Sequence, residues 1–228
     1  DDAIRPDPLA ACIPHRQTNR MTGDGRTVAA DSLQTLLGEA TAATPVHAFA
    51  RDTAAYRLLA DAVRRGNEVQ MRDRAFKREL LTWIRYNRAD SERTGDGLSN
   101  AVLGAPDLPR WLAKIIVHAM LNARTQNRTD AKHLAAASHL LLITSGSNDH
   151  AAHVAAGRVL QRLLLRATAA GIATAFLNQP CEVAALRAGL RENLPIDGHH
   201  PQILLRIGYA RKAACSRRRP IDDVIVPD

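Results

Sequence analysis

Apolar residues recur at helical spacing through most of the first half of the chain. The first helix is predicted to start at Asp31, which precedes Gln34 by three residues as in a capping box. A second helix is predicted with Asp52 as its N-cap and is expected to be interrupted at Gly66 and Asn67. Positions predicted to face a core in these two helices and in a third that follows are Leu33, Leu36, Leu37, Ala40, Ala55, Leu58, Leu59, Ala62, Val63, Phe76, Leu80, Trp83 and Ile84.

The pattern changes between residues 86 and 109, where Gly, Pro, Asp and Ser are frequent. This composition predicts a long loop, and long loops in compact domains are lids, binding segments or disordered stretches. Residues 88–109 are therefore a candidate lid. Helical spacing resumes from Trp111 to Asn122. Its predicted inward positions are Leu112, Ile115, Ile116 and Ala119.

Strands are indicated only in the second half. Residues 138–145 (SHLLLITS) form a short apolar run typical of a buried strand, and residues 201–209 alternate between apolar and mixed positions. Between them, residues 155–173 predict a helix with an outer stripe of Arg158, Arg162 and Arg166 that ends at Gly171, followed by a shorter helix over 181–192. Helices outnumber strands, so we expect one α+β domain over residues 1–228.

Composition limits the possible settings and partners. No apolar run approaches the roughly 18–20 residues that cross a bilayer, and the acidic, Pro-rich start lacks the order of a signal peptide. Three scattered cysteines suggest neither a disulfide framework nor a zinc site, so a reducing, cytoplasmic setting is expected. The chain does not start with Met, and it is expected to be processed, trimmed or part of a longer protein. The net charge of +8, almost all from Arg, suits anionic partners but also follows from codon bias.

Two arginine-rich segments stand near opposite ends of the chain. HRQTNR at residues 15–20 brings together guanidinium, hydroxyl and amide donors, which suit phosphate, and residues 217–219 are three consecutive arginines. The pair His150 and His153 has metal-compatible spacing, but no third ligand recurs nearby and no metal site is expected. Glycine-rich nucleotide loops and the hydrolase nucleophile motif are absent from the sequence.

The order of these segments resembles the nitroreductase superfamily of FMN flavoproteins, and the resemblance implies a nitroreductase-like fold in which helices surround a mostly antiparallel sheet. The stretches that carry the resemblance are RQTNR, AGRVLQRLLLRATAAGIAT, PQILLRIG and RRPIDDV. The likeness is closest to a double-length actinobacterial branch of NAD(P)H nitroreductases associated with dormancy. In that branch two nitroreductase-like halves share one chain, and this sequence resembles the C-terminal half to two thirds. A homodimer, or a pseudo-dimer with an N-terminal half outside the sequence given, is therefore expected.

The resemblance implies a set of cofactor-binding residues. The FMN phosphate would be held by the opening segment and by the arginines near the C-terminus, and the isoalloxazine edge would pass the stretch from Gly171 to Gln179. The residues so implied are Arg16, Thr18, Asn19, Arg20, Gly171, Ala173, Thr174, Arg217 and Arg218. No catalytic side chain is implied, because the cofactor carries the chemistry.

The implied activity is electron transfer from NAD(P)H through FMN to a nitroaromatic or quinone-like acceptor. An alternative in the same branch is a flavin-sequestering protein in which a lid, for which residues 88–109 are the candidate, excludes nicotinamide. A third possibility is nucleic-acid binding through the arginine surface, although few aromatic residues are available to stack on bases. Neither nucleic acid nor a membrane is the expected partner.

Overall fold

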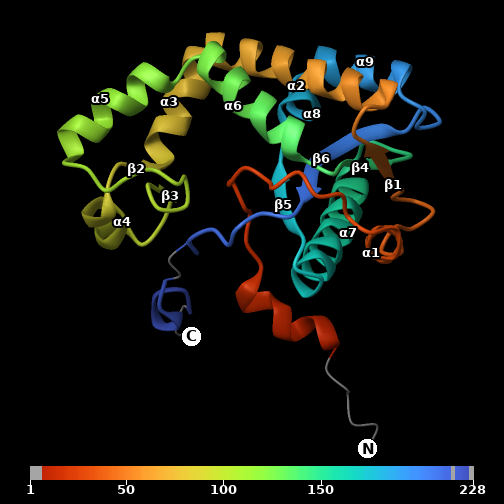
Figure 1. Cartoon of the computed structure of the whole chain (residues 1–228), viewed down its shortest axis with the longest axis horizontal. Coiled ribbons are helices and arrows are strands. Elements are labelled where there is room, and N and C mark those ends of the chain that lie inside the picture. The colour runs from red at the N-terminus through yellow and green to blue at the C-terminus, as the bar shows by residue number, and fades with distance from the viewer. Residues whose placement is uncertain (1–6, 217–218, 226–228) are drawn as a thin grey trace, which may run out of the picture.

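A computed structural model of the chain describes residues 7–216 and 219–225 (Figure 1). The elements, in chain order, are η1 (Pro8–His15), α1 (Ala30–Leu37), β1 (Val46–Ala50), α2 (Ala54–Arg72), α3 (Arg74–Trp83), β2 (Ile84–Arg85), α4 (Arg88–Thr94), β3 (Leu98–Ser99), α5 (Arg110–Met120), α6 (Ala123–Ala136), β4 (His139–Ser145), α7 (His150–Ala169), β5 (Ala173–Phe176), α8 (Gln179–Glu182), α9 (Ala184–Asn193), β6 (His200–Gly208) and η2 (Ile221–Asp223). The predicted α+β class is confirmed. No helix among the described residues is long and apolar enough to span a bilayer.

A four-stranded antiparallel sheet lies at the centre, in the order β1-β4-β6-β5. The two strands predicted from sequence are its middle strands, β4 and β6, and Leu141 of β4 stands opposite Leu205 of β6. Every residue of β4 is buried, as expected for a continuous apolar run covered on both faces. The strands β1 and β5 and the separate parallel pair β2–β3 were not predicted.

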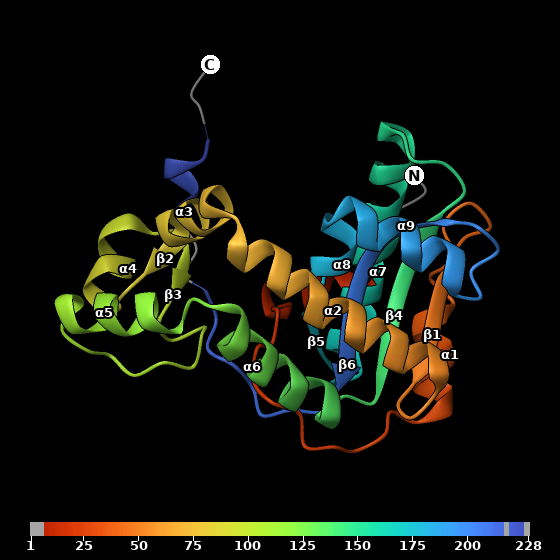
Figure 2. The same ribbon diagram turned by 90° about the horizontal axis from the view of Figure 1, so that it is seen from above.

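Helices cover both faces of this sheet (Figures 1 and 2). The helices α2, α6, α8 and α9 pack on one face, and α1 and α7 pack on the other. Because successive side chains of a strand point to opposite faces, Leu140 and Leu142 enter the first core while Leu141 enters the second. The predicted alternation of β6 is confirmed in the same way, with Leu204 in the first core and Leu205 in the second.

The helix α2 is continuous through Gly66 and Asn67, so the predicted interruption is wrong. Gly66 lies against α8 so closely that a Cβ there would stand 2.6 Å from the Cβ of Gln179. The Asn67 amide donates to Asp130 Oδ2 at 2.8 Å and accepts from Gln179 Nε2 at 3.1 Å. Both residues are therefore used for packing between helices, which outweighs their poor helix propensity.

The helix starts also differ from the prediction. The N-cap of α2 is Thr53, whose hydroxyl accepts from the Tyr56 amide at 3.2 Å, and not Asp52, which has a left-handed φ of 74°. The helix α1 begins one residue before Asp31, which lies within its first turn. In both places the backbone enters the helix within a residue of the expected point.

The segment from α3 to α5 forms a lobe beside the sheet (Figures 1 and 2). Residues 88–109 are not one continuous loop, because they contain α4 and β3. The helix α4 begins where the Asn87 side chain accepts from the Asp90 amide at 2.9 Å and ends at Gly95, whose φ is 64°. Its buried Asp90 carboxylate accepts from Arg110 at the start of α5, at 2.9 Å, and so ties the segment to the next helix.

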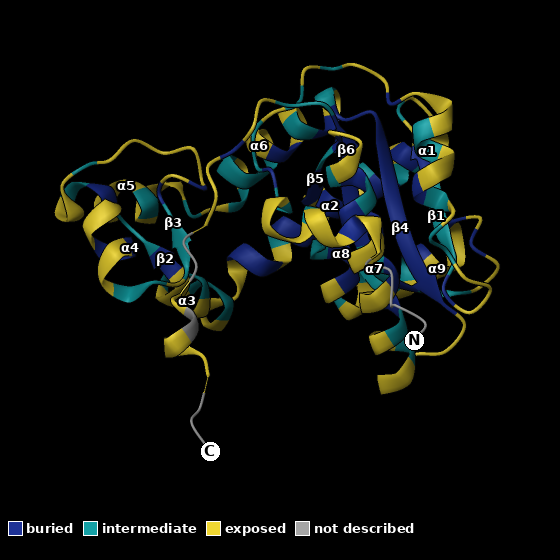
Figure 3. Cartoon of the chain, turned by 90° about the horizontal axis from the view of Figure 1, so that it is seen from below, coloured by how far each residue is buried: buried dark blue, intermediate teal, exposed yellow. Residues whose placement is uncertain are grey.

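Two predicted core faces in this lobe are wrong. Among the described residues α3 buries none of its own, although Ile84 after it is buried, and α5 buries only Ala113. Figure 3 shows this lobe largely in the colours of exposed and half-buried residues. Large apolar residues left exposed here include Trp83, Trp111, Ile115, Ile116 and Met120.

The long helix α7 has the predicted faces. Val159, Leu163 and Leu164 are buried against the sheet. Two arginines of its outer stripe, Arg162 and Arg166, each donate to a carboxylate oxygen of Glu39, at 2.5 and 2.6 Å. The outer stripe thus fixes the loop after α1 against α7.

Candidate functional site

The opening arginine-rich segment is extended and runs beside β5. The amide of Asn19 donates to the carbonyl of Thr174 at 2.8 Å. Nη2 of Arg206 in β6 donates to the carbonyls of Asn19 and Met21, at 3.1 and 3.0 Å. Arg206 is only 6% exposed, so a buried cation of the sheet sets the position of residues 19–21.

Side chains of this segment alternate between two pockets. Arg16, Thr18 and Arg20 border one pocket, which we call the arginine pocket. His15 and Asn19 border the other, which we call the β5 pocket, and Gln17 reaches both. An extended backbone sends successive side chains to opposite sides, so this alternation follows from the local conformation.

The arginine pocket has a volume of about 260 Å³ and draws on three parts of the chain. Its lining residues are Pro14, Arg16, Gln17, Thr18, Arg20, Leu98, Val102, Ala214, Cys215 and Ser216. The opening segment and residues 214–216 therefore meet at this pocket. Arg217 and Arg218 lie outside the described residues, so their part in the pocket stays a prediction.

Three donor side chains of the arginine pocket, those of Arg16, Thr18 and Arg20, have no side-chain partner within the described part of the chain. Arg20 is half-buried, and burial lowers the pKa of its guanidinium. No side-chain hydrogen bond or ion pair joins Arg16, Thr18 or Arg20 to any residue that the structure describes. Two guanidinium groups and a hydroxyl without acceptors are suited to an oxyanion with several acceptor oxygens.

The remaining predicted site residues lie elsewhere. Asn19 is buried, and its amide group is used within the chain: Nδ2 donates to the Arg211 carbonyl and Oδ1 accepts from the Met21 amide, both at 2.9 Å. Gly171 and Ala173 border the β5 pocket, which has a volume of about 300 Å³. Thr174 is buried in β5. The structure therefore brings together three of the predicted residues and places these four beside or behind them.

Several residues of the site were not among the predicted site residues. Arg206 positions the opening segment, and Leu98 and Val102 supply the apolar wall of the arginine pocket. An arginine within the otherwise apolar strand 203–207 was a usable signal, since a buried cation in a sheet requires nearby acceptors. Leu98 and Val102 lie in the segment that the sequence indicates as a candidate lid, but nothing in the sequence singles out these two residues within it.

The candidate lid borders the arginine pocket. Leu98 and Val102 both belong to residues 88–109. The same segment meets the C-terminal tail at Asp96: hydrogen bonds from Arg85 and Thr94 lower the pKa of its carboxyl, and the charge of Arg219 adds to this effect. The candidate lid and the tail are thus close to each other, and both contribute residues to the arginine pocket.

The fold matches that of solved nitroreductases. The nitroreductase NfnB of Mycobacterium smegmatis, solved in complex with NADPH, matches with a TM-score of 0.58 and 17% identity, over 96% of this chain and 98% of that one. A nitroreductase with bound FMN from Bacteroides fragilis matches with a TM-score of 0.56 and 16% identity, over 98% and 100%. The nitroreductase-like fold predicted from the sequence is therefore confirmed.

Two Mycobacterium tuberculosis proteins, from strains CDC 1551 and H37Rv, are similar in sequence. Their names give them provisionally as NAD(P)H nitroreductases, MT3217 and Rv3131. Each is 35% identical over 71 residues, which is 31% of this chain. The matched part of the chain spans about a fifth (21%) of the length of these relatives. No family model matches the chain.

Proposed function

We propose that this chain is an FMN-binding oxidoreductase unit that takes electrons from NAD(P)H. The FMN phosphate would occupy the arginine pocket, between Arg16, Thr18 and Arg20 on one side and the segment before Arg217 and Arg218 on the other. The matching structures with FMN or NADPH bound support this choice of cofactor and electron donor.

One observation carries the proposal. Arg20 is a half-buried cation without a counter-ion among the described residues, at a place where two ends of the chain converge. A desolvated guanidinium costs free energy unless an anion compensates it. A phosphate, with nearly two negative charges and three acceptor oxygens, would satisfy Arg20 together with Arg16 and Thr18.

When bound, FMN would accept hydride from NAD(P)H and pass the electrons to an acceptor. The chain's own residues bind and orient. Arg206 holds the backbone that carries Thr18 and Arg20, through the carbonyls of Asn19 and Met21. No side chain is required as a nucleophile or general base.

The proposal is tested by comparing FMN with riboflavin, which lacks the phosphate. Titration of each flavin into the flavin-free protein, followed by flavin fluorescence, should show a clear preference for FMN. In Arg20→Gln the dissociation constant for FMN should rise roughly tenfold or more, while that for riboflavin changes little, because a charge-assisted hydrogen bond is worth about 1.5–3 kcal/mol.

The matched control is Arg128→Gln, which removes the same charge from an exposed position in α6. This variant should keep the FMN preference. Equal affinities for FMN and riboflavin in the unchanged protein, or no flavin binding at all, would rule out a phosphate clamp in the arginine pocket.

The position of the lid also supports a second candidate, flavin storage. Leu98 and Val102 of residues 88–109 already form a wall of the pocket. A closed lid would exclude nicotinamide while all phosphate contacts remain. Oxidation of NADPH by the FMN-loaded protein with a nitroaromatic or quinone acceptor distinguishes the two: turnover supports the oxidoreductase, and its absence despite bound FMN supports storage.

We further propose that a second nitroreductase-like unit, either another copy of this chain or a half of a longer one, completes the flavin site. The lobe leaves Trp111 66% exposed, and further large apolar side chains of α3 and α5 are exposed as well. Apolar surface of this kind commonly marks a protein interface. The role in dormancy suggested by the resemblance remains a hypothesis.

A further inference from the structure

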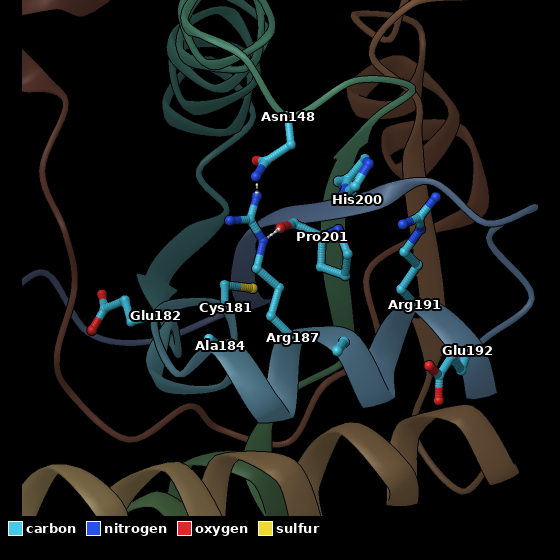
Figure 4. A pocket seen from close by; sticks show the side chains of 10 residues that line it. Asn148, Cys181, Glu182, Ala184, Arg187, Arg191, Glu192, His200 and Pro201 are labelled. Carbon is cyan, nitrogen blue, oxygen red and sulfur yellow. Dashed lines mark hydrogen bonds between the residues drawn. The ribbon is translucent and has the colours of Figure 1, made fainter.

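A pocket separate from the arginine pocket lies between α9, the start of β6 and the loop before α7 (Figure 4). We call it the α9 pocket. It has a volume of about 340 Å³ and shares no lining residue with the arginine pocket or the β5 pocket. Its charged and titratable lining residues are Cys181, Glu182, Arg187, Arg191, Glu192 and His200.

Arg187 is fixed in this pocket by neutral acceptors. Its Nε donates to the carbonyl of Pro201 at 2.6 Å, and its Nη2 donates to Asn148 Oδ1 at 2.6 Å and to Gln202 Oε1 at 2.7 Å. Nη1 has no acceptor within the described part of the chain. The guanidinium is thus held in one orientation while its charge is left without a carboxylate partner.

A second cation stands one helical turn further along α9. Arg191 lies four residues after Arg187, so both project from the same side of the helix, and Figure 4 shows both turned toward β6. The Nε of Arg191 donates to the carbonyl of Gly198 at 2.5 Å, again a neutral acceptor. Two guanidinium groups therefore share one pocket.

The imidazole of His200 adjoins both arginines. Burial lowers the pKa of His200, and the charges of Arg191, Arg187 and His199 lower it further. A neutral imidazole can donate one hydrogen bond. The side of the pocket formed by β6 therefore adds a donor and no negative charge.

The two carboxylates at the rim do not neutralise these cations. Glu182 accepts from Gln70 Nε2 at 2.6 Å and from Asn178 Nδ2 at 3.2 Å, and Figure 4 shows it directed away from Arg187. Glu192 points to the opposite side of α9 from Arg191 in the same view. Burial raises the pKa of Cys181 to about 12, so its thiol stays uncharged.

We propose that the α9 pocket binds the phosphate monoester group of a small molecule, with Arg187 and Arg191 as the cationic donors and His200 as a third donor. A monoester carries nearly two negative charges near neutral pH, which match two guanidinium groups without counter-ions. The volume lies within the range of small-molecule sites. The binding site is independent of whether the arginine pocket holds FMN.

The imidazole of His200 gives a local readout. Histidine proton resonances are followed by NMR while glycerol 2-phosphate is added at constant ionic strength, with His200→Gln used to assign the signal. Binding should shift the His200 resonance saturably. It should also raise the pKa of His200, because a bound anion favours the protonated ring. Chloride at the same ionic strength should do neither.

The decisive variant is Arg191→Gln, because Arg191 is exposed and makes a single hydrogen bond. The dissociation constant for glycerol 2-phosphate should rise roughly tenfold, the effect of one lost charge-assisted hydrogen bond. Arg158→Gln removes the same charge from an exposed position of α7 and should leave the constant unchanged.

Two results would overturn the proposal. One is a His200 shift that chloride reproduces, since this would reflect screening only. The other is an unchanged dissociation constant in Arg191→Gln. Arg20→Gln separates this site from the flavin site, because it should weaken FMN binding and leave the His200 titration as it was.

Discussion

The same substitution is expected to have opposite effects at two glycines within helices. Gly66 of α2 and Gly157 of α7 both occupy helix interiors. A Cβ at Gly157 would meet no heavy atom within 4 Å. A Cβ at Gly66 would lie 2.6 Å from the Cβ of Gln179, 3.1 Å from its carbonyl carbon and 3.3 Å from the nitrogen of Pro180.

The magnitudes follow from these neighbours. Alanine is favoured over glycine in a helix by about 1 kcal/mol, so Gly157→Ala should stabilise the protein by about that amount. Overpacking of a close interface costs about 1–3 kcal/mol. Two of the three neighbours of Gly66 are backbone atoms, which cannot rotate away from an added Cβ. The overpacking cost of Gly66→Ala is therefore expected to be about 3 kcal/mol. Gly66→Ala should therefore destabilise the protein by about 2 kcal/mol.

Thermal unfolding followed by circular dichroism measures both variants under identical conditions. For a chain of this size 1 kcal/mol corresponds to roughly 2–4 °C in Tm, so Tm should rise by about that much in Gly157→Ala and fall by about twice as much in Gly66→Ala. A rise in Tm for Gly66→Ala would refute the close approach of α2 and α8, and with it the reason given for the uninterrupted helix.

Three further predictions concern single contacts. Burial opposes ionisation of Glu39, but its hydrogen bonds from Arg166 and Arg162 outweigh this and keep its pKa below the ordinary value of 4.5. Its stabilising contribution is therefore present above pH 4.5 and lost as pH falls through the lower folded value, and urea titrations across this range should show a weaker acid dependence for Glu39→Gln. Tyr56→Phe removes a buried 2.7 Å hydrogen bond to a backbone carbonyl and should lower the free energy of unfolding by about 1–2 kcal/mol in urea, whereas an unchanged midpoint would contradict that bond. Trp111→Glu should reduce self-association in light scattering without altering the far-ultraviolet spectrum, and an unchanged mass distribution would exclude this face as the interface between copies.

The sequence predicted those elements whose hydrophobic pattern fits only one type of secondary structure. An apolar run such as 138–145 is long enough for a strand, and burial on both faces gives it no polar alternation. The helix α7 was predicted with its faces because its arginines and leucines separate cleanly around the helix. Both features depend on residues that are close together in the chain, so they can be predicted from the sequence alone.

Other features depend on partners that are distant in the chain. The apolar positions of α3 and α5 have helical spacing, but the spacing does not state what covers them, and Trp83 and Ile115 are left exposed. Glycine has a low helix propensity, so the sequence alone predicts a break at Gly66. Only the close approach of Gln179 shows why a glycine is needed at this position in the helix. In both cases the deciding contact lies outside any window of local sequence.

The candidate site also combines features that the sequence indicates with features that depend on distant contacts. The guanidinium and hydroxyl groups of residues 16–20 indicated an oxyanion site by their chemistry alone. The division of that segment between two pockets required its extended conformation. The use of the Asn19 amide to hold the Arg211 carbonyl required the position of the C-terminal segment, nearly two hundred residues away.

The two-sided opening segment constrains how its length can change in evolution or by design. Arg206 holds the segment in place at Asn19 and Met21. The side to which an earlier residue points therefore depends on how many residues separate it from Asn19. Deleting one residue between Arg16 and Thr18 would move Arg16 to the side of the β5 pocket, whereas deleting two would restore its side. Natural variants of this segment should therefore differ by even numbers of residues.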